Sequence, residues 1–301
     1  MIPVGSRFRS TRVAQGDAQM HHIDRRSILR AGAAGLASLA LPGLVAGGEP
    51  GRRRRNVLFL AVDDLNDWIG CYGGHPGVHT PHIDRLAAGG VTFERAYCPA
   101  PLCNPCRTAT LTGIRPSRSG IYGNDTYFRD VGALRDVRTL PQHLSAGGYR
   151  SFGGGKVFHK AGGWFSDPAS WTDQYSTASS TPRPPRQLSG MDWSGLGAYR
   201  QAHFDWGPID LPVEATGDWQ TAAGAAEILA RRHDAPFFLA CGIFRPHLPW
   251  YAPREFFDRF PLADVTLPTV PEDDLADVPP RGVRMAGPEV HERIVATGKW
   301  R

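Results

Sequence analysis

The sequence predicts an α/β fold with a mostly parallel central sheet flanked by helices. Two observations support this prediction. Apolar runs of strand length occur at 56–62 and 236–241, and the segments between them carry helix patterns that open at N-cap residues or prolines and end at glycines. Strands that alternate with helices favour a parallel sheet. In such sheets, functional residues gather at the carboxyl ends of the strands.

The first elements are expected in the order strand, helix, strand. Residues 56–62 form a continuous apolar run, as expected of a central strand that is covered on both faces. Thr80 and Pro81 open a helix that the glycines at 89–90 end. Residues 91–97 are then predicted to return as a strand.

The same alternation continues along the chain. We expect short helices at 108–112 and 140–146, each followed by glycine, and a strand at 149–152. An alanine-rich helix at 222–232 precedes the buried strand at 236–241. These elements complete the predicted α/β pattern.

Two segments depart from this alternation. Residues 161–218 hold Gly, Ser and Pro among four tryptophans, which predicts a long insertion over the sheet face. The tryptophans could stack on a sugar ring or pack inside the ordered loop, and the sequence leaves both readings open. Residues 261–301 form a tail rich in proline and acidic residues, with one short helix after Pro288 and no further strand.

The amino terminus is typical of a twin-arginine export signal. Arg25 and Arg26 precede a small apolar run at 31–46, which is shorter than the roughly 20 residues of a membrane-spanning helix. We therefore expect residues 1–50 to be a signal and linker read by the twin-arginine export machinery, with no stable membrane span. The protein would be exported, to the periplasm or the extracellular space.

The formal net charge of +5 does not indicate a nucleic-acid partner. A run of arginines at 52–55 contributes to it, and such a run is usually a solvated linker. Few basic clusters follow, so we expect no nucleic-acid binding. The chain also has five cysteines, and an odd number in an exported protein leaves one available for chemistry.

The most informative motif is Cys103-Asn104-Pro105-Cys106-Arg107, followed by Leu111-Thr112-Gly113. A zinc knuckle would need a second cysteine pair, which Cys98 does not complete. Buried inert cysteines would not explain the arginine or the Thr-Gly stop. The motif resembles the signature of the sulfatase family, Cys-x-Pro-x-Arg followed by Leu-Thr-Gly, and it matches at every specified position.

The resemblance implies an alkaline-phosphatase-like fold and a modified nucleophile. A formylglycine-generating maturation enzyme would oxidise Cys103 to formylglycine, whose aldehyde hydrate supplies the attacking oxygen, and Arg107 would stabilise the hydrate. The site opens a helix, where backbone N–H groups favour an anion.

The resemblance also gives a role to Asp63 and Asp64, which follow the first predicted strand. Alone, such a pair often only caps a turn. Together with Cys103, the two carboxylates would hold one divalent cation, for which we expect Ca²⁺ rather than Mg²⁺. The cation would bind the sulfate oxygens and neutralise charge that develops in the reaction.

Two further segments carry candidate catalytic residues. Lys156 would contact the sulfate, and His159 would hold and later deprotonate the formylglycine hydroxyl. His247 lies between two prolines and would protonate the departing alcohol oxygen. Taken alone, Lys156 and His159 would be read as surface residues, and His247 as packed against Trp250.

The resemblance implies a sulfuric ester hydrolase that removes sulfate from a sulfated carbohydrate. Segments at 65–73, 139–160 and 237–260 resemble the iduronate-2-sulfatase branch of the family. The family's further acidic ligands and second lysine have no counterpart, so residues 51–301 are expected to be the amino-terminal part of an incomplete catalytic domain. Alternatives are a phosphate or phosphonate ester hydrolase of the same fold and an inactive, truncated sulfatase-like fragment.

Overall fold

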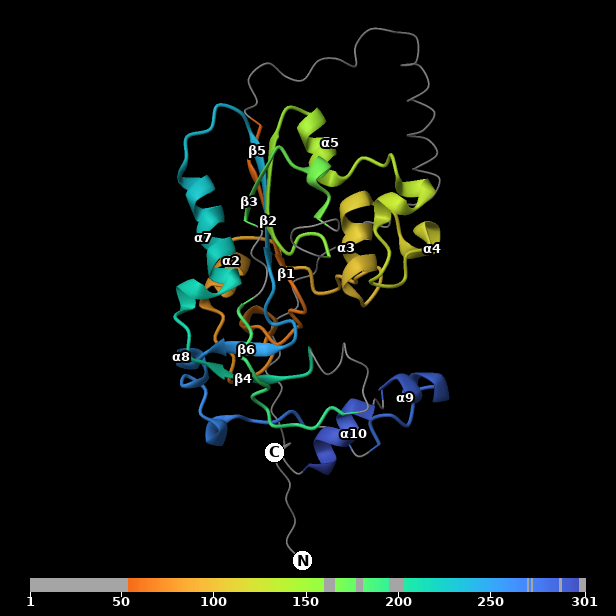
Figure 1. The fold of residues 1–301 in the computed structure, drawn as a ribbon, viewed down its shortest axis with the longest axis vertical. Helices are drawn as coiled ribbons and strands as arrows, with labels where there is room; N and C mark the ends of the chain where they lie inside the picture. Colours follow the sequence, from red (N-terminus) through yellow and green to blue (C-terminus); the bar gives the residue numbers. More distant parts are fainter. Residues whose placement is uncertain are drawn as a thin grey trace, which may run out of the picture. The chain divides into compact units, whose positions relative to one another are not determined.

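The computed structural model describes residues 54–301 apart from 160–165, 177–180, 195–202, 270, 272, 287–288 and 298–301. The export signal predicted at residues 1–50 lies outside the described residues. Four parallel strands form the main sheet in the order β1-β5-β2-β3, which confirms the predicted α/β class (Figure 1). They are β1 (Val57–Val62), β5 (Phe237–Ile243), β2 (Arg150–Gly155) and β3 (Asp173–Ser176).

Strand β5 lies inside the sheet, between β1 and β2, and its side chains alternate between two cores. Phe238 and Ala240 belong to the cluster that contains Leu111 and Phe158. Phe237, Leu239 and Cys241 belong to a second cluster, which includes Ala225 and Ile228. Since successive side chains of a strand point to opposite faces, the continuous apolar run of β5 is buried on both sides.

Helices cover the two faces of this sheet (Figure 1). Helix α7 (Gly217–Ala230) packs on one face against β5, β2 and β3. Helices α3 (Cys103–Thr112) and α5 (Leu140–Ala146) lie on the other face, where Leu111 of α3 joins the first core cluster. Helix α3 begins five residues earlier than the sequence pattern predicts, because Pro105 is tolerated in the first turn.

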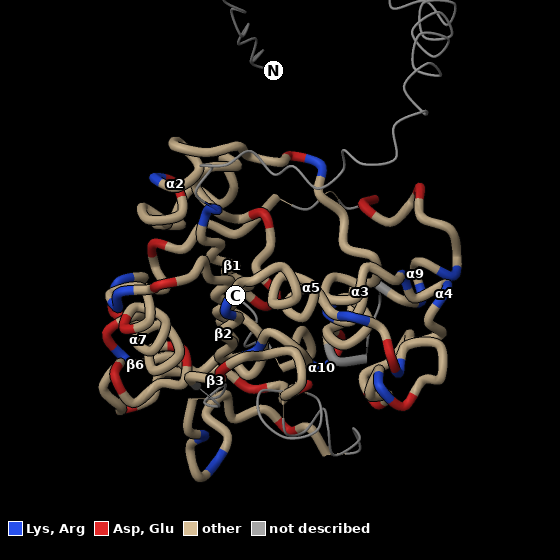
Figure 2. The backbone as a smooth tube through the Cα atoms, turned by 90° about the horizontal axis from the view of Figure 1, so that it is seen from above, with Lys and Arg blue, Asp and Glu red and all other residues tan. Residues whose placement is uncertain are grey.

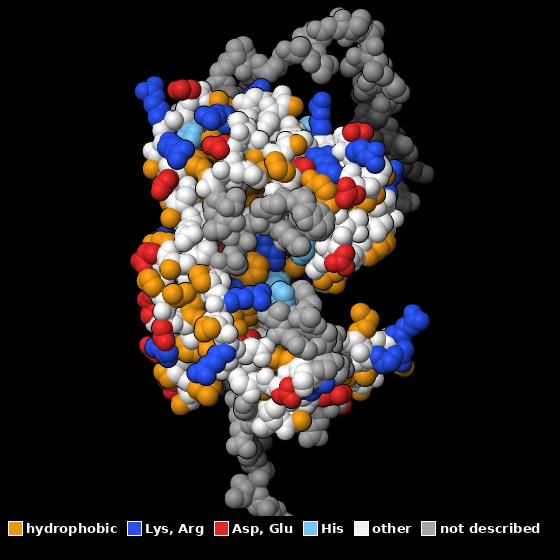
Figure 3. Space-filling view, viewed as in Figure 1, with side chains coloured by type: hydrophobic (Ala, Val, Ile, Leu, Met, Phe, Trp, Pro, Cys, Tyr) orange, Lys and Arg blue, Asp and Glu red, His pale blue; other side chains and the backbone are white. Residues whose placement is uncertain are grey.

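Strand β1 contradicts the expectation of a strand covered on both faces. It pairs with β5 alone among the described strands and lies at the edge of the sheet. Leu58 and Leu60 are 44% and 52% exposed, whereas Phe59 packs against the first cluster. Hydrophobic side chains also lie among charged ones on the face seen in Figure 3.

The predicted strand at 91–97 is wrong. The described backbone there forms turns and irregular structure, and Val91, Phe93 and Tyr97 are exposed. The alternation of apolar side chains in this segment resembles a strand, but within the described part of the chain no strand pairs with it.

The predicted insertion at 161–218 contributes to both sheets. Strand β3 extends the main sheet, and β4 (Trp206–Ile209) pairs in parallel with β6 (Trp250–Pro253). Trp171 stacks on Phe238 and Trp193 is buried beside Phe204, which favours packing for these two tryptophans. Trp164 lies outside the described residues.

The remaining elements are short. The α-helices are α2 (Pro81–Ala88), α4 (Pro116–Ser119), α8 (Arg254–Phe257), α9 (Pro280–Ala286) and α10 (Glu289–Ala296). The 3₁₀ helices are η2 (Gly70–Tyr72), η3 (Phe128–Asp130), η4 (Gly132–Leu134), η6 (Pro168–Ser170), η7 (Val213–Ala215) and η8 (Leu262–Asp264). Helix α10 confirms the short helix expected after Pro288, while α9 was not expected.

Charge and hydropathy add two observations. Acidic and basic residues are interspersed along the described backbone (Figure 2). None of the helices in the described ranges is both long and apolar enough to cross a bilayer.

Candidate active site

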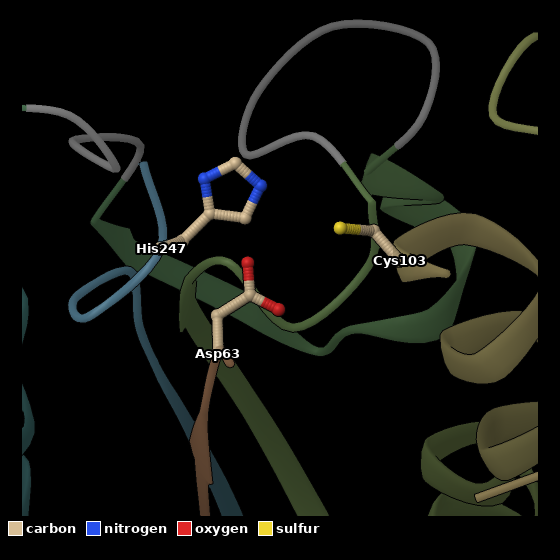
Figure 4. Close-up of side chains that lie close together, drawn as sticks. All are labelled: Asp63, Cys103 and His247. Carbon is tan, nitrogen blue, oxygen red and sulfur yellow. The ribbon is translucent and has the colours of Figure 1, made fainter. Parts of the chain in front are cut away.

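Three loops at the carboxyl ends of parallel strands meet beside the first turn of α3. Asp63 follows β1, Lys156 follows β2, and His247 follows β5. Ligand atoms of Asp63, Cys103 and His247 all lie within 4.8 Å of one another (Figure 4). This is the edge at which parallel sheets build their sites.

The three side chains line a cavity of about 520 Å³. Its polar wall includes Asp63, Asp64, Cys103, Arg107, Asn124 and His247. The apolar wall includes Phe59, Leu65 and Leu111. The cavity is large enough for a small ligand and combines apolar surface with a few convergent polar groups.

Asp63 is buried and carries two ion pairs. Its Oδ1 accepts a hydrogen bond from Arg107 at 2.5 Å, and its Oδ2 accepts one from the Lys156 ammonium. Burial acts to raise the pKa of this carboxyl, but the charges and hydrogen bonds of Arg107 and Lys156 outweigh it and lower the pKa. Asp63 is therefore an anion held between two cations.

Arg107 connects two of the loops. Besides Asp63, its guanidinium donates to the backbone oxygens of Lys156 and, at 2.9 Å, of Val157. A guanidinium presents several donors in a fixed planar arrangement, which suits simultaneous contacts of this kind. Arg107 thus ties α3 to the loop after β2 as well as to the end of β1.

Cys103 is the first residue of α3, with Leu102 as the N-cap. Its Sγ lies 3.7 Å from the Lys156 Nζ. Burial raises the pKa of the thiol, and the Asp63 and Asp64 carboxylates act in the same direction against Lys156 and Arg107. The backbone at this position is a helix N-terminus, where negative charge is favoured.

The first turn of α3 is fixed by an asparagine that sequence reasoning missed. Asn104 is buried, its backbone N–H donates to Asn124 Oδ1 at 2.9 Å, and its side chain donates to the backbone oxygens of Gly123 and Thr126. These bonds hold the helix start against the 123–126 loop. The motif allows any residue at this position, so the residue type gave no signal. The only available signal was that Asn104 lies inside the signature.

Lys156 is buried and held by a close contact between two strands. Its backbone N–H donates to Gly242 O at 2.9 Å, and its Nζ lies 4.5 Å from the centre of the Phe244 ring. The preceding Gly155 has φ +68°, and a Cβ there would lie 2.1 Å from Gly242 O. Only glycine fits this position, and it turns the chain so that Lys156 points toward Asp63.

His247 has a defined tautomer in its neutral form. Its Nδ1 lies 2.5 Å from the backbone oxygen of Leu248, which can only accept, so Nδ1 carries the proton. The Nε2 atom lies 4.0 Å from Asp64 Oδ2. The nearest aromatic ring in contact is Phe244, 4.7 Å between centroids, rather than Trp250, which is half exposed.

The loop that carries His247 is anchored by Asp218 of α7. The two carboxylate oxygens accept hydrogen bonds from the backbone N–H groups of Phe244 at 2.6 Å and Arg245 at 2.9 Å. Cis peptide bonds precede Pro246 and Pro249 in the same loop. Sequence reasoning missed Asp218, because an aspartate in the first turn of a helix is expected there for the helix alone.

His159 is half buried, three residues after Lys156, and is not among the residues that line the cavity. The structure therefore brings together five of the predicted catalytic and metal-binding positions, Asp63, Cys103, Arg107, Lys156 and His247, with Asp64 exposed at the rim.

The donor set fits a divalent cation in part. Asp63 and Asp64 supply hard carboxylate oxygens next to Cys103, as a Ca²⁺ or Mg²⁺ site requires. Two carboxylates fall short of the about 6–8 oxygen ligands of Ca²⁺. Water, substrate or residues beyond those described here would complete the shell.

Comparisons with known proteins agree with this geometry. The sulfatase family profile matches residues 55–278. A sulfatase from Formosa agariphila is 37% identical over 259 residues, covering 82% of this chain and 50% of that protein. Human iduronate 2-sulfatase is 33% identical over 223 residues, covering 72% of this chain and 40% of that enzyme. The chain thus spans half or less of the length of these relatives.

A solved structure shares the fold. The phosphonate monoester hydrolase SpPMH from Silicibacter pomeroyi superposes with a TM-score of 0.51 and 22% identity, covering 74% of this chain and 48% of that one. At this identity the likeness concerns the alkaline-phosphatase-like architecture alone. The family profile covers the signature and the three loops that meet at the cavity, and on that basis the chain belongs to the sulfatase family.

Proposed function

We propose that this chain provides the nucleophile-bearing part of a sulfuric ester hydrolase that removes sulfate from a sulfated carbohydrate. One observation carries the proposal: Cys103 lies at the start of α3 in the same cavity as Asp63 and His247, with the Lys156 ammonium 3.7 Å from its sulfur. An oxygen nucleophile at position 103 would lie beside a positively charged site that suits an anion such as a sulfate group.

The anion site is built from the chain's own cations. Lys156 and Arg107 bring two positive charges to Asp63, and the N-terminus of α3 adds backbone N–H groups. A sulfate group that enters the cavity would share these cations with Asp63. Formylglycine at position 103 would supply the hydrated aldehyde oxygen for attack on sulfur.

A divalent cation held by Asp63, Asp64 and residue 103 would neutralise charge on the sulfate oxygens. We propose Ca²⁺ for this position, because the side chains of Asp63 and Asp64 both offer hard oxygen atoms. The ion pairs of Asp63 use one lone pair on each carboxylate oxygen, which leaves further lone pairs available.

His247 is the proposed general acid. Its Nε2 lies 4.0 Å from the Asp64 carboxylate, and an Nε2–H would give its proton to the departing alcohol oxygen. We propose His159, three residues after Lys156, as the residue that handles the hydroxyl proton of residue 103.

Relatives support the substrate class. Iduronate 2-sulfatase and N-acetylgalactosamine-6-sulfatase are named for sulfated sugars. We propose the same class for this chain, with export by the twin-arginine route and Cys103 conversion by a formylglycine-generating enzyme. The activity of the whole protein is part of this proposal, because the chain spans 50% of the Formosa agariphila sulfatase and 40% of human iduronate 2-sulfatase.

The test starts with the nucleophile. The protein is expressed with a formylglycine-generating enzyme, and the peptide containing Cys103 is examined by mass spectrometry for replacement of the CH₂SH group by CHO. Cys106→Ser serves as the control in the same helix, and Cys103→Ser should show no conversion. An intact Cys103 thiol after this expression would remove the proposal.

Turnover then separates the alternatives. We expect hydrolysis of an aryl sulfate to exceed that of the matching aryl phosphate and to be lost in Cys103→Ala. A clear preference for phosphate would favour a phosphate or phosphonate ester hydrolase. Complete conversion with added Ca²⁺ and no turnover of either ester would favour the inactive fragment.

A further inference from the structure

The chemical state of Cys103 changes which metals the site accepts. In the structure Cys103 is a free thiol, and its Sγ, a carboxylate oxygen of Asp63 and a ring nitrogen of His247 lie within 4.8 Å of one another. We propose that the unconverted chain binds one thiophilic divalent cation, of the zinc class, through these three residues. This goes beyond the proposed function, which uses converted Cys103 and a hard cation.

The donor types select the metal. Zn²⁺ is bound by Cys sulfur, His nitrogen and Asp oxygen, usually in a four-coordinate tetrahedral shell. Ca²⁺ and Mg²⁺ prefer oxygen ligands alone. A sulfur and an imidazole beside a single buried carboxylate therefore favour Zn²⁺ or Co²⁺ over the cation of the converted enzyme.

His247 is oriented for this role. Its Nδ1–H donates to the Leu248 carbonyl at 2.5 Å, so the Nε2 lone pair is available for a metal. Histidine ligands in metal sites usually donate their other ring N–H to a backbone carbonyl or carboxylate in this way. The exposed Asp64 carboxylate, 4.0 Å from Nε2, offers a fourth donor.

The geometry needs only a small contraction. Ligand distances of about 2.0–2.3 Å place the donors of a tetrahedral shell about 3.5 Å apart. From a spacing of at most 4.8 Å, the side chains would close by roughly 1 Å. Asp63 directly follows β1, Cys103 begins α3 and His247 lies in the loop after β5, so rotation about side-chain χ angles can supply this movement.

The charges allow the ion to enter. Asp63 and Asp64 provide two negative charges near the positive charges of Lys156 and Arg107, and the Cys103 sulfur adds a third when it loses its proton on binding. On binding, the sulfur–metal bond forms as the thiol proton passes to solvent. The metal ion would replace the Lys156 ammonium as the partner of Asp63 Oδ2, and the ammonium would move away from this oxygen.

The experiment uses the untagged chain expressed without a maturation enzyme and titrated with Co²⁺ under reducing conditions. We expect one Co²⁺ per chain, a near-ultraviolet band from thiolate-to-cobalt charge transfer, and displacement by Zn²⁺ but not by excess Ca²⁺. Cys103→Ser should abolish the band. His247→Gln should weaken Co²⁺ binding at least about tenfold. Mutation of residues that only hydrogen-bond to a metal ligand already lowers metal affinity about 10- to 100-fold.

Two cysteines in the same cavity provide matched controls. Cys106→Ser and Cys98→Ser should keep the band, because neither belongs to the ligand cluster. The proposal is overturned by a wild-type protein without the band, by a band that survives in Cys103→Ser, or by a band that disappears in Cys106→Ser.

The converted protein gives a second comparison with an intact fold. Formylglycine at position 103 removes the sulfur, so the charge-transfer band should vanish in proportion to conversion, and a band that persists at full conversion contradicts the assignment. Ester hydrolysis plays no part in these readings. Failure of the metal site and failure of the sulfatase proposal are therefore separate results.

Discussion

Asp63 and Lys156 form an ion pair in which the side chains are 6% and 4% exposed, joining the ends of β1 and β2. Removing one partner of a buried pair leaves a charge that lacks compensation. We expect Lys156→Met to lower the free energy of unfolding by about 3 kcal/mol, the low end for broken buried pairs, because Arg107 still contacts Asp63.

The measurement is guanidinium-induced unfolding followed by circular dichroism. Arg254→Met is the control, because it removes an ion pair with Asp210 whose side chains are largely exposed. Exposed pairs contribute about 0–1 kcal/mol. Equal losses in the two variants would show that the Asp63–Lys156 pair adds nothing beyond an ordinary surface contact.

Asp167 predicts a pH dependence of stability. This buried carboxylate accepts two hydrogen bonds from Arg129, at 3.0 and 2.9 Å, and others from Tyr127 and Ser170. Burial acts to raise its pKa, but these partners outweigh it and lower the pKa below that of the unfolded chain. The resulting stability is complete above the unfolded pKa of about 3.9 and is lost as the pH falls through the folded value.

We therefore expect the unfolding free energy to decrease as the pH falls below about 4 and to decrease less steeply in Asp167→Asn. Asp210→Asn, at an exposed position, should follow the wild-type curve. Denaturant titrations at several pH values check both statements. Parallel curves for wild type and Asp167→Asn would refute the role of this carboxylate.

Elements with local signals could be predicted from the sequence. Strand β5 and helices α2 and α5 follow from apolar runs, N-cap residues and glycine stops that act over a few residues. The edge position of β1 could not, because an apolar run does not reveal which strands pair with it. Strand β3 has the sequence Asp-Gln-Tyr-Ser, and its strand character comes from pairing with β2.

The site shows the same division. The signature identifies Cys103 and Arg107, and the strand ends identify Asp63 and His247. The anchors Asn104 and Asp218 act through hydrogen bonds to or from backbone groups distant in sequence, so their residue type alone carries no signal. Likewise, only the fold shows that Arg107 contacts the carbonyls of the 156–157 loop.

Asp218 is expected to position His247 through the backbone. Asp218→Ala removes both acceptors of the Phe244 and Arg245 amides, so these amides should exchange with deuterium faster, at least about tenfold if each bond contributes about 1.4 kcal/mol. Hydrogen-exchange mass spectrometry of the peptide spanning 242–250 measures this. Asp210→Ala is the control, and unchanged exchange in Asp218→Ala would contradict the anchoring role.

The exposed face of β1 predicts self-association. Leu60 is 52% exposed on a strand that, within the described ranges, has a free edge, and an unpaired apolar edge is a template for pairing with another chain. We expect Leu60→Lys to shift the protein toward monomer at high concentration, with a stability change within about 0.5 kcal/mol. Leu239→Lys at a fully buried position of β5 should instead prevent folding, since it places a charge inside the second core cluster. Sedimentation at several concentrations measures the first effect and circular dichroism the second. If wild type and Leu60→Lys associate equally, the edge of β1 is not the surface through which the chain meets its own copies.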